Sequence, residues 1–316
     1  MTDDLTPAER QARSLADLLS ILELRELGTG RITVTGVDDV SVGVGTPHID
    51  VYEGDSLKQP HNRVYGGQVL AQSLTAANLT IRDEHPGRLP HSLHAYFLRP
   101  GDDTLPIRFS VERMRDGRSF SARRVHALQH DRTILSLTVS YQDPAGGLDH
   151  HDEMPEVPAP EDLAPVAEKF ATIDHPRALH LVGRPVDHRY VEGDITLQVD
   201  SAHAARQDVW FRLLGEVGPD PYRQASVLAY MSDYTLLESV LRRHGRSWMD
   251  PSLRVASLDH SMWFHRIVDP SQWLLYSQDS PSAQGGRGLG VGKVFTRDGV
   301  LTTTIAQEGM VRVKGG

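Results

Sequence analysis

The sequence predicts an α+β fold in which one structural unit occurs twice, each copy a helix followed by antiparallel strands. In the first half, residues 66–79 form a predicted helix rich in small residues, a strand begins at His91, and further strands fill 108–142. The second half repeats this order with the predicted strand DVWFRLLG, a helix within VLAYMSDYTLLESVLRR, the strand VASLDHSMWFHR, and strands from WLLYSQDS to the end. Small side chains on the first helix let a curved sheet approach closely.

A nearly constant shift between the two halves supports this duplication. His91 and His260 are 169 residues apart. Ser119 and Arg287, each at the start of paired strands, are 168 residues apart, as are Tyr65 and Asp233 in the two helical regions. We therefore expect two copies of one unit in one chain.

A linker and an N-terminal helix complete the predicted organisation. Leucines at 15, 18, 19 and 22 repeat at helical spacing, and Gly28 is placed to cap that helix. Residues 143–165 combine proline, glycine and acidic side chains without periodicity, which predicts a solvated linker. His150 to Glu153 offer metal ligands, but neighbours on an exposed tether seldom converge on one ion. The predicted domains are 1–142, the linker 143–165, and 166–316.

Composition excludes several classes of protein. The 316 residues carry a formal net charge of -9, which disfavours a nucleic-acid-binding protein, although a local basic patch stays possible. The absence of cysteine removes disulfides, thiolate nucleophiles and cysteine metal sites. The polar, acidic start does not resemble a secretory signal, and no stretch is apolar enough to span a membrane. We expect a cytoplasmic enzyme or binding protein that does not act on a membrane.

A glycine-rich stretch near the C-terminus, GGRGLGVGK, fails the pattern of a phosphate-binding loop. Its glycines at 286, 288, 290 and 292 alternate with the period of a strand and leave one face without side chains. Either close packing against another element or contact with a slender ligand explains this face, and packing is favoured.

Three polar residues in the second half are candidates for chemistry. Asp233 has apolar neighbours at helical spacing, so its carboxylate is either functional or held structurally by backbone groups. Alternation places Gln307 on the core face of the last strand, and Ser257 lies in a strand that is apolar on both faces. Each also has a structural explanation as a satisfied core hydrogen bond. No nucleophile elbow or HExxH motif occurs, so water is the expected nucleophile of a hydrolase.

Six ordered motifs resemble those of type II acyl-CoA thioesterases, the TesB-type double hotdog family. The motifs are RVYGGQVLAQSL, HSLHAYFLRPGD, RDGRSFSARRV, ASLDHSMWFHR, LLYSQDSPSAQGGRG and DGVLTTTIAQEGMVR. The resemblance spans about residues 10 to 313 and implies a tandem (double) hotdog, in which each half is a central helix wrapped by an antiparallel sheet. It also implies hydrolysis of fatty acyl-CoA to a free fatty acid and coenzyme A by an activated water.

The resemblance assigns catalytic roles to Asp233, Ser257 and Gln307, which match the family's water-binding residues. Bacterial relatives commonly have threonine at the position of Ser257, a change that keeps the hydroxyl. The segment of about 29 to 62 is longer than in bacterial members and has no assigned role. The chemistry suits these residues, because a carboxylate accepts the proton of a water that a hydroxyl and an amide orient. No metal or cofactor is expected.

Two substrate-binding sites are also predicted. Gly66, Gly67 and Gln68 begin the first central helix, where free backbone N–H groups are candidates to hold an oxyanion, although packing explains the glycines equally well. Arg118, Arg123 and Arg124 lie in the densest basic run of the strands and are candidate ligands of the coenzyme A phosphates. Solvated charges paired with nearby acids are the alternative explanation.

Acyl-CoA is the expected partner, in a homo-oligomer. The alternative functions are a double-hotdog hydratase or dehydratase, and a non-catalytic acyl-CoA-binding module.

Overall fold

The computed structural model describes residues 5–31, 48–170, 173, 181–199 and 202–314. The strands form one antiparallel sheet in the order β1-β2-β4-β5-β6-β3-β10-β13-β12-β11-β8-β7, with β9 pairing on β13. In the first half the strands are β1 (Arg25–Arg31), β2 (His48–Gly54), β3 (Leu89–Phe97), β4 (Ile107–Asp116), β5 (Phe120–Gln129) and β6 (Arg132–Gln142). In the second half they are β7 (Val186–Tyr190), β8 (Arg206–Leu213), β9 (Leu253–Ser257), β10 (Asp259–Phe264), β11 (Leu274–Gln284), β12 (Arg287–Thr296) and β13 (Leu301–Val313).

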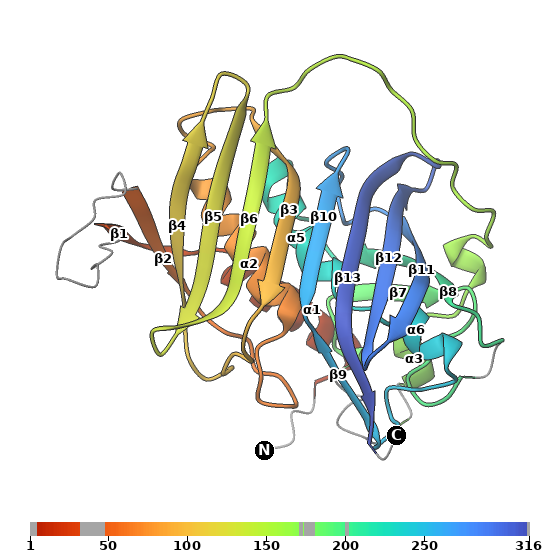
Figure 1. Ribbon diagram of the computed structural model, residues 1–316. Coiled ribbons are helices and arrows are strands. Elements are labelled where there is room, and N and C mark those ends of the chain that lie inside the picture. The colour runs from red at the N-terminus through yellow and green to blue at the C-terminus, as the bar shows by residue number, and fades with distance from the viewer. Residues whose placement is uncertain (1–4, 32–47, 171–172, 174–180, 200–201, 315–316) are drawn as a thin grey trace.

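The central helices α2 (Gly66–Leu79) and α5 (Pro221–Ser232) lie together behind the sheet (Figure 1). They run antiparallel, because Asn78 near the end of α2 donates to the backbone oxygen of Tyr222 near the start of α5. At the other end of the pair, Tyr65 donates to the backbone oxygen of Tyr230. The two halves join at the seam where β3 pairs with β10. This arrangement confirms the double hotdog.

The N-terminal helix α1 (Pro7–Ile21) packs against both halves. A capping box between Thr6 and Glu9 begins it, and it ends at Leu22, well before Gly28. The expectation that Gly28 caps this helix is therefore wrong, since Gly28 lies at an irregularity of β1 with φ of 111°. The segment of about 29 to 62 supplies part of β1 and all of β2, and its residues 32–47 lie outside the described part.

The long helix expected around Asp233 is two helices. α5 ends at Ser232, Asp233 is its C-cap, and α6 (Glu238–Arg243) follows after a turn. The starts of α2 and α5 are 221 − 66 = 155 residues apart. The shift of 168 that we inferred for the helices is therefore wrong, because the second half has extra chain between its helix and β10. The 3-10 turn Pro160–Asp162, near the end of the linker, and the short helix α3 (Val166–Phe170) precede β7.

The strand expected across Ser257 is also interrupted. β9 pairs with the end of β13, β10 pairs with its start, and Leu258 lies between them. Leu258 donates to the backbone oxygen of Glu308, and Asp259 accepts a hydrogen bond from the N–H of Glu308. The break gives Ser257 a cross-strand position opposite Gly309, two residues from Gln307, so both side chains lie on the inner face.

The linker is only partly solvated. It arches away from β6 toward the second half (Figure 1), and residues 145–153 are exposed. Further along, Met154, Val157 and Leu163 pack on a buried cluster that contains Trp210, whose indole N–H donates to the oxygen of Pro158. The second part of the linker therefore covers apolar side chains of β8 and β11 to β13 that face away from the central helices.

The alternating glycines of β12 serve close packing. A β carbon on Gly290 would lie 2.6 Å from the backbone oxygen of Leu236, and one on Gly288 would collide with Val240 of α6. Side chains at these positions would push the helical segment away from the sheet. The packing explanation is confirmed for these glycines, and it brings residues 236–240 against β12.

Candidate active site

Asp233 lies where the two halves meet. It caps the C-terminal end of α5, directly opposite the N-terminal end of α2. Ser232, which precedes it, is buried and lies 2.9 Å from Nε2 of His260 on β10. Burial lowers the pKa of His260 to about 3, so this imidazole is neutral at pH 7. The Ser232–His260 contact ties the end of α5 to the sheet and thereby fixes the backbone that carries Asp233.

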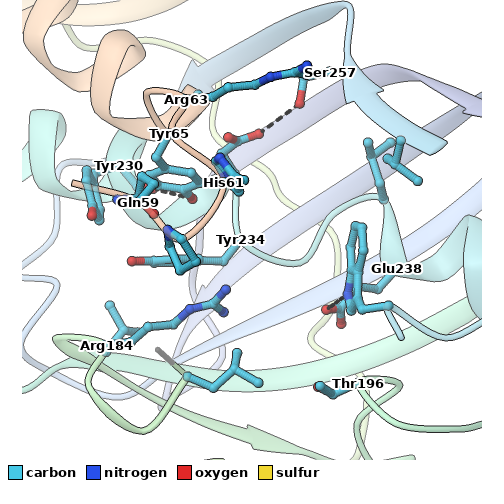
Figure 2. A pocket seen from close by; sticks show the side chains of 18 of the residues that line it. Gln59, His61, Arg63, Tyr65, Arg184, Thr196, Tyr230, Tyr234, Glu238 and Ser257 are labelled. Carbon is cyan, nitrogen blue, oxygen red and sulfur yellow. Dashed lines mark hydrogen bonds between the residues drawn. The ribbon is translucent and has the colours of Figure 1, made fainter. Parts of the chain in front are cut away.

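The structure brings Asp233, Ser257 and Gln307 together. Nε2 of Gln307 donates to Oδ1 of Asp233 at 2.6 Å and to Oγ of Ser257 at 2.8 Å. Oγ of Ser257 is 3.5 Å from the same carboxylate oxygen. Gln307 is buried, whereas Asp233 and Ser257 keep some exposed surface. The three side chains converge from the end of α5, from β9 and from β13, which are widely separated in the sequence. Figure 2 shows Ser257 at the edge of the adjoining cavity.

The carboxylate of Asp233 has an environment suited to a base. Burial raises its pKa to about 6, while hydrogen bonds from Gln307, from the backbone of Gly67 and from Ser257 oppose this rise. Oδ1 faces Gln307 and Ser257, and Oδ2 lies beside Gly66. An aspartate with this pKa is mostly ionised at pH 7, yet binds a proton more readily than an exposed aspartate.

The described residues of the first half hold no second copy of this constellation. The helix starts align Asn78 with Asp233, and Asn78 accepts a hydrogen bond from Tyr141 and donates to Ser226. Tyr222 completes the contact by accepting from Asn78 through its backbone oxygen. All three partners are bonded within the protein, so this position is structural.

A cavity of about 1650 Å³ opens beside Asp233 and Ser257. Its walls come from both halves and include Gly66, the rings of Tyr65, Tyr230 and Tyr234, and Arg184 (Figure 2). Tyr65 stacks on Tyr234 with ring centroids 4.9 Å apart and meets Tyr230 edge-on at 5.0 Å. A narrow molecule can therefore lie along aromatic surface with one end at the carboxylate.

Of the predicted oxyanion residues, the structure brings Gly66 and Gly67 to Asp233 but not Gln68. Gln68 is fully buried, its side chain bonds to Leu57, Asp55 and Gln72, and its N–H donates to Tyr65. The assignment of Gln68 to substrate binding is therefore wrong, since its polar groups are already bonded within the protein. Gln68 instead holds the start of α2 against the chain that leads into it.

The three predicted phosphate-binding arginines do not form one surface. Arg123 is fully buried and donates to Thr80 and Asp116, so its guanidinium is not available to a ligand. Arg124 faces Glu112, and Arg118 is exposed near the tip of the β4–β5 hairpin. None of the three lines the cavity. The expectation that Arg123 binds phosphate is wrong. Its side chain lies on the inner face of β5, where acceptors within the protein already bind its guanidinium.

The sequence reasoning missed the cations that do line the cavity. Arg63, Arg99 and Arg254 are exposed, and Arg184 is part-buried. The four arginines come from four separate segments of the chain. Each lies outside a predicted helix or strand, or next to the end of one. No local spacing signals such a set, because only the packing of the two halves assembles it.

Within the described residues, one group has three potential metal ligands close together, namely Glu84, His85 and Asp116. Glu84 and Asp116 already pair with Arg113 and Arg123, and none of the three lines the cavity. The linker residues His150 and His151 are exposed. The site around Asp233 therefore consists of protein acid, hydroxyl, amide and backbone groups.

The fold and site define a double-hotdog protein with one polar constellation at the junction of its halves, and comparisons with known proteins agree. Residues 56–142 match the acyl-CoA thioesterase N-terminal domain and residues 185–310 match the acyl-CoA thioesterase family. Acyl-CoA thioesterase 2 of Haemophilus influenzae is 38% identical over 83% of this chain and 92% of its own length. Human acyl-coenzyme A thioesterase 8 is 37% identical over 84% of this chain and 85% of its own.

The chain belongs to the acyl-CoA thioesterase family and is a hydrolase of acyl-CoA thioesters. A crystal structure of an acyl-CoA thioesterase II from Mycobacterium marinum superimposes with a TM-score of 0.73 at 38% identity, covering 95% of this chain and 99% of the other. An 18% identical protein with a hot dog fold from Alicyclobacillus acidocaldarius has a TM-score of 0.70 and supports the fold alone. Among the described residues, no helix is long and apolar enough to cross a membrane.

Proposed function

We propose that Asp233, Ser257 and Gln307 carry out the hydrolysis with water as the nucleophile. Asp233 removes a proton from a water that Ser257 helps to orient, and the new C–O bond forms at the thioester carbonyl. Collapse of the tetrahedral intermediate breaks the C–S bond, and the proton held by Asp233 passes to the leaving sulfur. The products are a carboxylic acid and coenzyme A. The observation that carries this proposal is the double hydrogen bond of Gln307 to Asp233 and Ser257.

Gln307 acts as the positioning group of this set. Because its one amide nitrogen donates to both the carboxylate and the hydroxyl, Oγ of Ser257 is left with its proton free to point at water or at Asp233. Threonine in place of Ser257 would offer the same hydroxyl. The serine therefore preserves the donor while leaving space for one methyl group in the cavity wall.

The start of α2 is the proposed oxyanion site. The first N–H groups of a helix have no partner within the helix and carry partial positive charge. Gly67 directs its N–H at Asp233, so Gly66 is the residue whose N–H remains for the substrate oxygen. A donor of this kind is worth about 10²-fold or more in rate when it meets a developing oxyanion.

The cavity is lined by apolar side chains and by exposed arginines, and each kind of residue suits one part of an acyl-CoA substrate. Apolar side chains including Val69, Phe97 and Leu135 line the cavity and suit a fatty acyl chain. Exposed Arg63, Arg99 and Arg254 form what we call the rim arginines, and none has an ion pair with a described acid. The rim arginines are the proposed contacts of the coenzyme A phosphates, which need cations on a protein of net charge -9.

No metal or cofactor takes part in this proposal, since the carboxylate and the helix N-terminus supply the base and the oxyanion donor. The protein is proposed to be a cytoplasmic homo-oligomer that needs neither nucleic acid nor membrane. Exposed Tyr96 and Trp263 lie on the outer face across the β3–β10 seam and suit contact with a second copy. Light scattering after gel filtration tests the assembly, and cell fractionation tests the location.

A thiol-trapping assay of coenzyme A release from octanoyl-CoA tests the catalytic proposal. Asp233→Asn is expected to lower kcat by 10²-fold to 10⁴-fold, the range for removal of a general base. Ser257→Ala and Gln307→Ala lower it as well, and the triple variant is little worse than the worst single one because the groups act as a unit. Asp103→Asn is the matched control, since Asp103 is a buried carboxylate outside the cavity lining. Near-normal turnover by Asp233→Asn would disprove the assignment.

A further inference from the structure

The last turn of α5 has carbonyl groups that the helix itself cannot satisfy, since the four C-terminal carbonyls of a helix lack N–H partners within it. Side chains satisfy two of them. Oγ of Ser232 donates to the oxygen of Ala229 at 2.9 Å, and the hydroxyl of Tyr276 donates to the backbone oxygen of Ser232 at 3.3 Å. That oxygen belongs to the peptide unit that joins Ser232 to Asp233. The end of α5 is thus held by side chains at the residue before the proposed base.

His260 holds the same residue from a second strand. Its Nε2 lies 2.9 Å from Oγ of Ser232. A carbonyl oxygen only accepts, so the single hydroxyl proton of Ser232 lies toward Ala229, and Nε2 of His260 carries the proton that it donates to Oγ. Nδ1 is then a bare acceptor, and it has no hydrogen-bond partner among the residues that the structure describes. The neutral imidazole therefore acts as a donor to the end of α5.

These contacts come from interior strands of the sheet. β10, which carries His260, lies between β3 and β13, and β11, which carries Tyr276, lies between β8 and β12. Both side chains and Ser232 are buried. A β carbon on Gly292 of β12 would collide with the ring of Tyr276, so this glycine leaves the space that the ring occupies. The sheet therefore decides where the end of α5 lies.

The contacts of Asp233 depend on the position of this helix end. Its Oδ1 accepts from Nε2 of Gln307 at 2.6 Å, and its Oδ2 lies beside Gly66. Movement of α5 away from the sheet would lengthen the first contact and open the second. A displacement of about 1 Å can cost about 10²-fold in rate when it misplaces a reacting group. Burying an imidazole with one nitrogen unpartnered is also unfavourable, and a role in catalysis explains why His260 is kept.

We propose that His260 and Tyr276 are positioning residues for the hydrolysis, which act through Ser232 to hold Asp233 between Gln307 and Gly66. This inference rests on the proposed role of Asp233 as the base. We call His260, Tyr276 and Ser232 the α5 clamp. None of the three lines the cavity, so the α5 clamp acts on Asp233 and not on the substrate.

Kinetics of octanoyl-CoA hydrolysis test the α5 clamp with substitutions that remove or keep one donor. His260→Leu removes the N–H group, whereas His260→Gln keeps an amide N–H near the place of Nε2. We expect His260→Leu to lower kcat about tenfold to 10²-fold with little change in KM, and His260→Gln to restore most of the rate. Tyr276→Phe should lower kcat by a smaller factor, because its hydrogen bond is longer. In the Asp233→Asn background, His260→Leu should have no further effect, since it acts through Asp233.

The pH–rate profile separates positioning from a general loss of structure. The hydrogen bonds that Asp233 accepts lower its pKa against the effect of burial, so a displaced carboxylate that stays buried titrates at higher pH. The rising limb of kcat/KM in His260→Leu should therefore lie at higher pH than in the wild type. Burial raises the pKa of each tyrosine that interacts electrostatically with Asp233, so these hydroxyls stay neutral and do not contribute to the limb; they are Tyr65, Tyr234 and Tyr276.

Tyr141→Phe is the matched control. Tyr141 is a buried tyrosine of the first half, and its hydroxyl donates to the side chain of Asn78 on α2 at 2.8 Å. Its loss removes a buried hydrogen bond to the other central helix. We expect this variant to have a lower melting temperature, with kcat and the rising limb as in the wild type.

Two results would overturn the proposal. One is a wild-type kcat in His260→Leu. The other is a loss of kcat that His260→Gln does not restore and that leaves the rising limb in place, which would make the α5 clamp structural only. If His260→Leu does not fold, Tyr276→Phe and Ser232→Ala carry the same test with the same expected shift. A wild-type profile without a limb near pH 6 would instead reject the proposed base.

Discussion

A β carbon on Gly66 would lie 2.6 Å from Oδ2 of Asp233, closer than real β carbons approach a neighbour. The first residue of the N-terminal central helix and the acid of the C-terminal one are thus in direct contact across the junction of the halves. The site therefore depends on both halves of the chain, although its three polar side chains all come from the second half.

Gly66→Ala is therefore expected to reduce activity far more than stability. The added methyl group displaces the carboxylate or moves the start of α2, and either shift separates the proposed oxyanion donor from the base. We expect kcat to fall about 10²-fold, the value of one oxyanion donor. Steady-state kinetics and thermal unfolding measure the two effects. Gly146→Ala, in open space on the linker, is the control, and wild-type turnover by Gly66→Ala would contradict the contact's importance.

The rate should depend on pH through Asp233. Its pKa is raised to about 6, and the base acts only when ionised, so kcat/KM should rise as pH increases through about 6 and level off above it. Gln307→Ala removes a hydrogen bond that lowers this pKa, and the rising limb should move to higher pH. A pH–rate profile from 4.5 to 8.5 checks both statements. A profile that is flat across pH 6 would exclude Asp233 as the titrating base.

Ionisation of Asp233, which activity requires, should lower the stability of the folded protein. The pKa of Asp233 is about 6 in the folded state, above the ordinary aspartate value of 3.8 in the unfolded chain, so the folded protein binds more protons between these pH values and loses stability as pH rises through them. The cost of ionised Asp233 is complete above pH 6 and amounts to about 3 kcal/mol. Asp233→Asn should therefore be more stable than wild type at pH 7.5, with the difference shrinking toward pH 4.

Urea unfolding of the two proteins at both pH values measures this difference. The expected result is a gain in stability that accompanies the loss of activity, which is characteristic of a residue kept for function. If Asp233→Asn is equally destabilised at both pH values, the carboxylate serves packing instead.

Charge reduction at the rim should weaken coenzyme A binding selectively. Replacing Arg63, Arg99 and Arg254 together by glutamine should raise KM for octanoyl-CoA about tenfold, with a smaller effect on the N-acetylcysteamine thioester. Added salt should weaken wild-type binding for the same reason. The double variant Arg118→Gln, Arg124→Gln is the matched control away from the cavity. If that pair has the larger effect, the nucleotide binds at the β4–β5 hairpin.

Activity should persist after metal removal. The proposed base and oxyanion donor are protein groups, so dialysis against a chelator should leave kcat for octanoyl-CoA unchanged. The same assay before and after dialysis, with added Mg²⁺ or Zn²⁺ as a control, checks this. Loss of activity that a divalent ion restores would reveal a metal in the mechanism.

The sequence by itself determined the duplicated α+β unit, because helix and strand periodicity and a repeated order of motifs are local properties. It also selected Asp233, Ser257 and Gln307, since a polar residue among apolar neighbours at regular spacing is visible along the chain. Alternation alone gave the inward orientation of Gln307, which the structure confirms by burial.

Tertiary structure decided what those residues touch. The sequence did not reveal that α5 ends at Asp233 or that the strand breaks at Leu258, because extra chain and a hydrogen bond from Glu308 to Asp259 override the local pattern. The sequence wrongly assigned Arg123 to a phosphate site. Its acceptor Thr80 is distant in the sequence, and the alternation of the strand did not show that Asp116 on the neighbouring strand would accept from it. The sequence also did not predict that Arg184 and the rim arginines line the cavity. The cavity wall is assembled from distant segments, and only the packing of the two halves brings these side chains together.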